Sequence, residues 1–124
     1  MTLEAIDHVQ LAIPSGGEEK ARAFYGALLG LRERPKPAAL AGRGGCWFEG
    51  GALKVHCGVE EPFRPAHKAH IAFRVDNVRT LAARATREGF EVVDDDELPG
   101  HERVFIFDPF GNRLEFLRPV IEAK

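Results

Sequence analysis

The strongest constraint on the fold is an internal repeat that divides the chain into two halves. His8 heads the alternating run HVQLAI, and His70 heads the similar run HIAFRV 62 residues later, in a chain of 124 residues. In both runs apolar residues follow the histidine at alternate positions, which is the pattern of a half-buried β-strand. Self-similarity at a fixed spacing indicates duplicated structural units, so we expect the halves to share one topology.

Each of these strands is followed by a helical pattern and then by short extended runs. The segments 16–30 and 77–89 carry apolar residues at helical spacing, with Gly30 and Gly89 placed to end the helices and Asn77 placed as an N-cap. Glycine and proline break the sequence after each helix into three extended runs. These runs lie at 31–35, 45–50 and 52–59 in the first half and at 90–95, 103–108 and 113–119 in the second.

The order of these elements predicts an α+β fold made of two βαβββ modules. Module 1 spans about 4–60, a proline-punctuated linker follows at 61–67, and module 2 spans about 68–119, within one domain of residues 1–124. The last runs of the halves also correspond, because Val55-His56-Cys57 aligns with Leu114-Glu115-Phe116 after a short gap. Neither module could cover its sheet alone, so we expect two modules to pack together, within one chain or between chains.

Composition excludes several classes of function. The formal net charge is −2, so the chain lacks the basic surplus that binds nucleic acid. No apolar run approaches the roughly 18 to 20 residues that span a bilayer, and residues 1–8 do not resemble a signal peptide. Two cysteines, Cys46 and Cys57, are too few for a disulfide framework, although they could still pair with each other. These features predict a cytoplasmic protein without a nucleic-acid or membrane partner.

Four potential metal ligands fall on the polar faces of the predicted strands. Side chains alternate across a strand, so His8, His56, His70 and Glu115 lie opposite the apolar residues that would pack on the helices. Three imidazoles and one carboxylate suit a divalent cation such as Zn²⁺, Ni²⁺, Fe²⁺ or Mn²⁺. The alternative is that each histidine is simply exposed to solvent on its strand.

Several cationic and amide side chains share these predicted faces. Beside a metal, they would favour a small substrate that is anionic or rich in oxygen, such as a hydroxy acid, an enediolate or a phosphonate. The alternative places them in water at strand ends. The candidate substrate-binding residues are Gln10, Lys54, Arg74 and Arg113.

The chain resembles the vicinal oxygen chelate superfamily, which includes glyoxalases, bleomycin-resistance proteins, fosfomycin-modifying thiol transferases and extradiol dioxygenases. The resemblance covers essentially the whole chain and rests on IDHVQLAIP, FYGALLGL, AHIAFRVDNV and, most specifically, FDPFGNRLEFLRP at 107–119. It implies that paired βαβββ modules form a cup-shaped mixed sheet with helices on its outer face, often in a homodimer. It also implies that His8, His70 and Glu115 are metal ligands.

His56 stands where similar glyoxalases carry a second glutamate, which also serves as their base. The resemblance therefore implies that His56 is either a fourth metal ligand or a general base. The predicted catalytic residues are His56 and Glu115. We expect a metal-dependent, glyoxalase-like enzyme that acts on a small oxygenated substrate, with lyase, isomerase, thiol transferase and dioxygenase reactions all open. The alternative is a metal-free protein that sequesters a drug, as bleomycin-resistance proteins do.

Three further residues receive simpler interpretations. His67 and His101 fall outside the repeat in loop-like segments, so we expect both to be solvated, with His101 placed to reach the mouth of the cavity as an acid or base. Cys46 has no evident partner that would lower its pKa, and we expect it to be a structural thiol.

Overall fold

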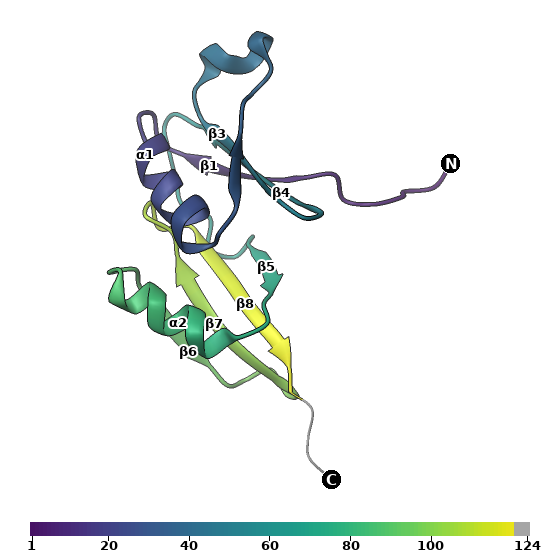
Figure 1. Cartoon of the computed structure of the whole chain (residues 1–124), viewed down its shortest axis with the longest axis vertical. Coiled ribbons are helices and arrows are strands. Elements are labelled where there is room, and N and C mark those ends of the chain that lie inside the picture. Colours follow the sequence, from purple (N-terminus) through teal and green to yellow (C-terminus); the bar gives the residue numbers. More distant parts are fainter. Residues whose placement is uncertain (121–124) are drawn as a thin grey trace. The chain divides into compact units, whose positions relative to one another are not determined.

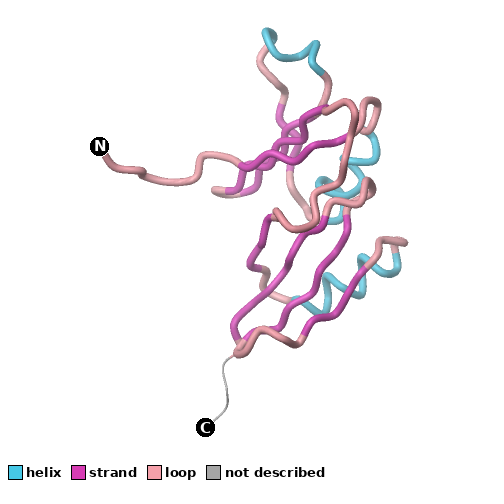
Figure 2. The backbone as a smooth tube through the Cα atoms, turned by 180° about the vertical axis from the view of Figure 1, so that it is seen from behind, coloured by secondary structure: helices cyan, strands magenta, loops and turns pink. Residues whose placement is uncertain are grey.

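The computed structural model describes residues 1–120 and divides the chain into two compact units, Met1–Pro65 and the segment from Ala66 onward. Each unit contains one four-stranded sheet, and Figures 1 and 2 show the two sheets from opposite sides. Within residues 1–120, no helix is long and apolar enough to cross a membrane.

The first unit has the order strand, helix, three strands. Its strands are β1 (Val9–Ile13), β2 (Arg32–Arg34), β3 (Cys46–Gly50) and β4 (Leu53–Val59). A helix follows β1, as α1 (Glu18–Ala21) and then as the π-helix η1 (Arg22–Leu28), and a 3₁₀ helix, η2 (Ala38–Arg43), connects β2 to β3. The sheet order is β1-β4-β3-β2, in which β1 is parallel to β4 and the other pairs are antiparallel.

The second unit repeats this arrangement. Its strands are β5 (Ile71–Arg74), β6 (Val92–Asp95), β7 (His101–Phe107) and β8 (Arg113–Pro119), and α2 (Val78–Arg87) follows β5. The sheet order is β5-β8-β7-β6, again with one parallel pair, β5 with β8. The predicted α+β fold of two βαβββ modules is therefore confirmed, and we call the two units module 1 and module 2.

Strand register shows that the correspondence between the modules extends to single residues. His56 is paired with Gln10, which lies two residues after His8, and Glu115 is paired with Ala72, which lies two residues after His70. His56 and Glu115 therefore occupy equivalent positions, as the alignment of their strands predicts.

Each module buries the apolar faces of its strands under its helix. In module 1 the fully buried side chains include Ile13, Phe24, Tyr25, Phe48 and Val55. In module 2, α2 packs on β6, β7 and β8 through Val78, Ala82 and Ala85, and Figure 1 shows this helix lying along the sheet. The opposite, polar face of each sheet is left for the candidate ligands.

The predicted N-cap of α2 and the glycines predicted to end both helices are present, but the first helix is not a regular α-helix. Asn77 Oδ1 accepts a hydrogen bond from Thr80 N at 3.0 Å, which is the predicted N-cap. Gly30 and Gly89 have φ values of 77° and 90°, as residues that terminate helices commonly do. The difference is that the first helix widens into π-helical turns, in which Leu29 N donates to Phe24 O five residues earlier.

The turn between β7 and β8 contains a buried polar network. Asp108 Oδ1 accepts from the backbone N–H groups of Phe110 and Asn112, and Asp108 Oδ2 accepts from Asn112 Nδ2, each at 2.9 Å. Asn112 Oδ1 in turn accepts from Ala66 N at 2.9 Å. The motif DPFGN at 108–112 therefore fixes the backbone just before β8, the strand that carries Glu115. Through Asn112 the motif is also hydrogen-bonded to Ala66, the first residue of module 2.

Replacing Asp108 with Ala is expected to lower the free energy of unfolding by about 3 kcal/mol, because the change leaves buried donors without their charged acceptor. Denaturant unfolding followed by circular dichroism measures this loss. Asp96→Ala, at an exposed position in the same module, should change stability by less than about 0.5 kcal/mol. Equal effects of the two substitutions would contradict a structural role for the turn network.

Candidate metal centre

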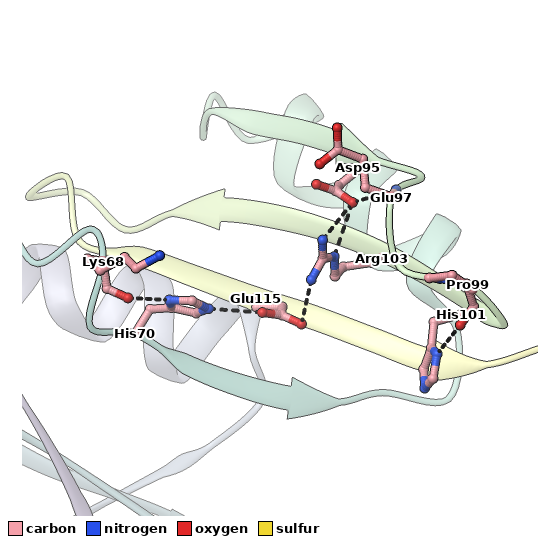
Figure 3. A network of polar contacts seen from close by, with 8 residues as sticks. All are labelled: Lys68, His70, Asp95, Glu97, Pro99, His101, Arg103 and Glu115. Atoms are coloured by element: carbon pink, nitrogen blue, oxygen red, sulfur yellow. Dashed lines mark hydrogen bonds and ion pairs between the residues drawn. The ribbon is translucent and has the colours of Figure 1, made fainter.

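Module 2 brings His70 and Glu115 into direct contact. His70 immediately precedes β5, and Glu115 lies at the middle of β8, the neighbouring parallel strand. His70 Nε2 lies 2.9 Å from Glu115 Oε1, and Glu115 is only 8% exposed. Figure 3 shows the two side chains pointing toward each other on the polar face of the sheet.

The second nitrogen of the His70 ring is held by the backbone. Nδ1 lies 2.9 Å from the Lys68 carbonyl oxygen. A carbonyl oxygen can only accept, so Nδ1 carries a proton and donates it. Metal-binding histidines are usually held in this way through one ring nitrogen and bind the metal through the other, which here is Nε2, the atom that faces Glu115.

Glu115 has a second partner beyond His70. Arg103 Nη1 lies 3.5 Å from Glu115 Oε2, and Arg103 Nη2 lies 2.8 Å from Asp95 Oδ1. The hydrogen bonds from Arg103 lower the pKa of Asp95, so this carboxylate stays charged. Figure 3 shows the resulting row of polar contacts, which runs from the start of β5 across β8 and β7 to β6.

Module 1 brings its two candidate histidines together as stacked rings. The His8 and His56 ring centroids are 4.3 Å apart, and the His56 ring lies 4.0 Å from Trp47 with an interplanar angle of 4°. Trp47 is directly opposite His56 in the antiparallel pair of β3 and β4. This stack covers His56, which is 8% exposed.

The outer ring of the stack is oriented by a carboxylate. His8 Nδ1 lies 2.9 Å from Asp7 Oδ2, and Lys54 Nζ lies 3.9 Å from Asp7 Oδ1. An ionised carboxylate accepts hydrogen bonds, and the hydrogen bond with His8 is the main cause that lowers the pKa of Asp7. His8 Nδ1 is therefore the donor, which leaves His8 Nε2 as the candidate ligand atom.

His56 is kept neutral by its surroundings. Burial, and then the neighbouring His8 ring, lower the pKa of His56 below its ordinary value. A neutral imidazole is the form that binds a metal or accepts a proton.

A fall in pH is expected to destabilise the protein through His56. In the unfolded chain His56 takes up a proton near its ordinary pKa of 6.5, whereas the folded chain takes it up at lower pH. The unfolded state therefore binds more protons below pH 6.5, and the free energy of unfolding falls as pH decreases. Denaturant unfolding at pH 7 and pH 5 should show a smaller pH effect in His56→Phe. An equal effect in both proteins would contradict this assignment.

The candidate substrate-binding residues have different surroundings. Arg113 lies over the Phe105 ring, with its guanidinium carbon 3.9 Å from the ring centroid, and the structure gives it no ion pair with any of residues 1–120. Gln10 is exposed on β1 and lies beside Gly58. Lys54 contacts Asp7, and Arg74 is exposed at the end of β5. Arg113 is thus a cation held on an aromatic ring, two residues before Glu115 on β8.

The remaining candidates have local partners. His67 Nε2 lies 3.1 Å from Gly111 O, in the turn network of module 2. His101 is the first residue of β7 rather than a loop residue, since β7 is longer than the predicted run, and its Nδ1 lies 3.0 Å from Pro99 O. His101 is paired with Pro119 at the end of β8, away from Glu115, and Figure 3 shows this separation. Cys46 and Cys57 are buried, directly opposed in register and not joined by a disulfide. Contrary to the expectation from the sequence, Cys46 has a partner, because its hydrogen bond with Cys57 lowers the pKa of Cys46.

Sequence reasoning did not find Arg103, Asp95 or the Trp47 stack. Strand alternation places Arg103 on the same face as Phe105, and Asp95 on the same face as Val93. The contact between Arg103 and Asp95 follows only when the register of β6 and β7 is known, because that register pairs the two residues. Among residues 1–120, the structure shows no group of three or more His, Cys, Asp and Glu side chains placed to hold a metal ion. The candidate ligands form one pair in each module, His8 with His56 and His70 with Glu115.

Comparison with known proteins identifies the family. The sequence model of the glyoxalase/bleomycin resistance protein/dioxygenase superfamily matches residues 5–116, nearly the whole chain. The chain belongs to this superfamily. A search of the curated proteins found no match.

Solved structures of other superfamily proteins have the same fold. A protein from Bacillus anthracis described as a glyoxalase family member is 47% identical, with a TM-score of 0.90 over 96% of this chain and 98% of its own.

A variant of the fosfomycin resistance protein FosX from Listeria monocytogenes, complexed with Mn(II) and dihydroxypropylphosphonic acid, is 17% identical with a TM-score of 0.75, over 93% of this chain and 90% of its own. An antibiotic binding protein from a Streptomyces species is 22% identical with a TM-score of 0.71, over 96% of this chain and 98% of its own. At these identities the likeness shows the shared fold.

Proposed function

We propose that this superfamily member is a metal-dependent, glyoxalase-like enzyme acting on a small oxygenated substrate. The proposal gives His8, His70 and Glu115 the role of metal ligands and makes His56 a further ligand or a general base. The observation that carries it is the orientation of His8 and His70, whose Nδ1 atoms donate to Asp7 and to the Lys68 carbonyl, while His70 Nε2 faces Glu115 Oε1 at 2.9 Å. Metal-binding histidines are held in this way in proteins generally.

The donor set also limits the metal. Three neutral imidazoles and one carboxylate favour Zn²⁺, Ni²⁺, Fe²⁺ or Mn²⁺ over Ca²⁺ or Mg²⁺, which prefer oxygen donors alone. When bound, the metal would supply a Lewis acid for two neighbouring substrate oxygens. Glu115 supplies a negative charge to the site, and burial keeps His56 neutral so that it can serve as a ligand or hold a proton.

The substrate is proposed to carry an anionic or oxygen-rich group. Arg113 supports this because its guanidinium is fixed on Phe105, while no carboxylate of residues 1–120 forms an ion pair with it. A cation–π contact positions a guanidinium and leaves its N–H groups free to bind an anion. Gln10, Lys54 and Arg74, on or beside the polar strand faces, are proposed as further contacts for the substrate.

A second candidate function is the sequestration of an aromatic drug without chemistry. The stack of His8, His56 and Trp47 favours it, because the outer ring offers an aromatic face against which a planar molecule can stack. The likeness in fold to an antibiotic binding protein is in keeping with this alternative. The orientation of the two histidines favours the metal-dependent enzyme.

Chelation and reconstitution test the proposed enzyme. The purified protein is assayed with hemithioacetals, with epoxides that carry a phosphonate together with thiol or water, and with catechols. We expect turnover of one class that disappears with a chelator and returns when Mn²⁺, Ni²⁺, Zn²⁺ or Fe²⁺ is added. Tight binding of an aromatic antibiotic that is unaffected by chelation, with no turnover of any class, would favour sequestration instead. We also propose that the enzyme is a cytoplasmic homodimer, which sedimentation and cell fractionation would test.

A further inference from the structure

We propose that Arg103, fixed by Asp95, is a positioning residue that orients the Glu115 carboxylate for metal binding. This inference rests on the proposed function, because it assumes that Glu115 is a metal ligand. Neither Arg103 nor Asp95 belongs to the predicted ligand or substrate-binding sets.

Arg103, on β7, lies between two carboxylates: Asp95 on β6 and Glu115 on β8, the strands on either side. Its Nη2 and Nε atoms lie 2.8 and 3.2 Å from Asp95 Oδ1, and its Nη1 atom lies 3.5 Å from Glu115 Oε2. The Arg103, Asp95 and Glu115 side chains are only 18%, 16% and 10% exposed. Charges that are shielded in this way are less screened by water and salt than surface ion pairs.

The two oxygens of Glu115 have separate partners. Oε1 faces His70 Nε2 at 2.9 Å, and Oε2 faces Arg103. Because Arg103 contacts Oε2, rotation of the carboxylate is restricted and Oε1 stays directed toward His70 Nε2. Oε1 and His70 Nε2 are thus presented to the same point, which is what two ligands of one metal require.

Asp95 completes the arrangement by fixing the guanidinium. Its Oδ1 atom also accepts a hydrogen bond from Glu97 N at 2.9 Å, so the carboxylate is anchored to the backbone. Its negative charge offsets that of Arg103, which lessens the repulsion between the guanidinium and a nearby metal cation. Figure 3 shows these contacts.

Arg103 differs in this respect from Arg113, the other arginine that lies over Phe105. The guanidinium of Arg103 is already engaged by two carboxylates, whereas Arg113 has no ion pair among residues 1–120. The geometry therefore gives the two arginines different tasks. Arg103 positions a ligand, and Arg113 is free to meet the substrate.

The test compares Arg103→Met, Arg103→Lys and Asp95→Asn with the control Arg79→Met, which removes an exposed ion pair with Asp94 in the same module. Competition with a chromophoric chelator gives the dissociation constant for Zn²⁺ or Mn²⁺. We expect affinity to fall by about 10- to 100-fold in Arg103→Met, the usual effect of losing a group that orients a ligand. Arg103→Lys should recover part of this loss, Asp95→Asn should cause a smaller one, and Arg79→Met should cause none.

A metal-free readout separates this inference from the proposed function. The ¹⁵N resonance of His70 Nε2 in the chelated protein should move in Arg103→Met, because Glu115 Oε1 is no longer held against the ring, and should not move in Arg79→Met. Unchanged affinity together with an unchanged His70 resonance would overturn the positioning role. Tighter metal binding in Arg103→Met would also overturn it, since Arg103 would then act only as a repelling charge.

A wild-type protein that binds no metal would contradict the proposed function, and the His70 resonance would still decide whether Arg103 holds Glu115. Asp95→Asn provides the same two readouts if Arg103→Met does not fold, which circular dichroism shows.

Discussion

Replacing His8 and Glu115 together with Ala is expected to lower the affinity for a divalent transition metal by roughly 10⁴-fold or more. Structural Zn²⁺ sites bind with an apparent free energy of about 10–16 kcal/mol, so each of four ligands contributes roughly 2.5–4 kcal/mol. Each lost ligand then costs on the order of 10²- to 10³-fold in affinity. Titration of the chelated protein with Zn²⁺ or Mn²⁺ measures the change.

The matched control removes two imidazoles that are not candidate ligands. His67 and His101 have backbone partners in Gly111 and Pro99, so the double variant His67→Ala, His101→Ala should bind metal as the wild type does. Stoichiometric, high-affinity metal in the His8→Ala, Glu115→Ala variant would show that the ligands are elsewhere.

The His56→Ala substitution is expected to weaken metal binding and to reduce turnover by roughly 10²- to 10⁴-fold, the range over which a positioned catalytic group acts. His56 and Glu115 occupy equivalent positions in their modules, which favours the same role for both. His56→Glu should largely restore metal affinity, because glutamate is the residue that similar glyoxalases carry at this position.

The alternative role of His56 predicts a different combination. If His56 is a general base, metal content survives in His56→Ala while turnover falls. His56→Phe is the structural control, since an aromatic ring keeps the stack on Trp47 but removes the nitrogen atoms. Full metal affinity and full turnover in His56→Ala would mean that His56 only covers the face of the sheet.

The repeat and the strand alternation were enough to predict the topology of each module and the face of the sheet on which each candidate ligand lies. His8 and His70 each precede the first strand of a module, and His56 and Glu115 share one register position. This succeeded because alternation along a strand is a local property of the backbone. The wide π-helical turns after Arg22 and the 3₁₀ helix at Ala38–Arg43 have no comparable local signal.

The orienting groups could not be predicted from the sequence. Arg103 reaches Asp95 because β6 and β7 pair in a register that places the two residues opposite each other. The His70 ring is held by a backbone carbonyl, and such contacts depend on the path of the chain rather than on residue type. The stack of Trp47 on His56 likewise depends on the register of β3 and β4.

The metal content of the native protein tests the central claim most directly. The full chain is purified without chelator and without a histidine tag, and its metals are measured by inductively coupled plasma mass spectrometry against protein concentration. The proposed function predicts about one divalent transition-metal ion per chain, removed by chelation and restored by titration. A protein that carries no such metal and takes up none from Zn²⁺, Ni²⁺, Fe²⁺ or Mn²⁺ would contradict it.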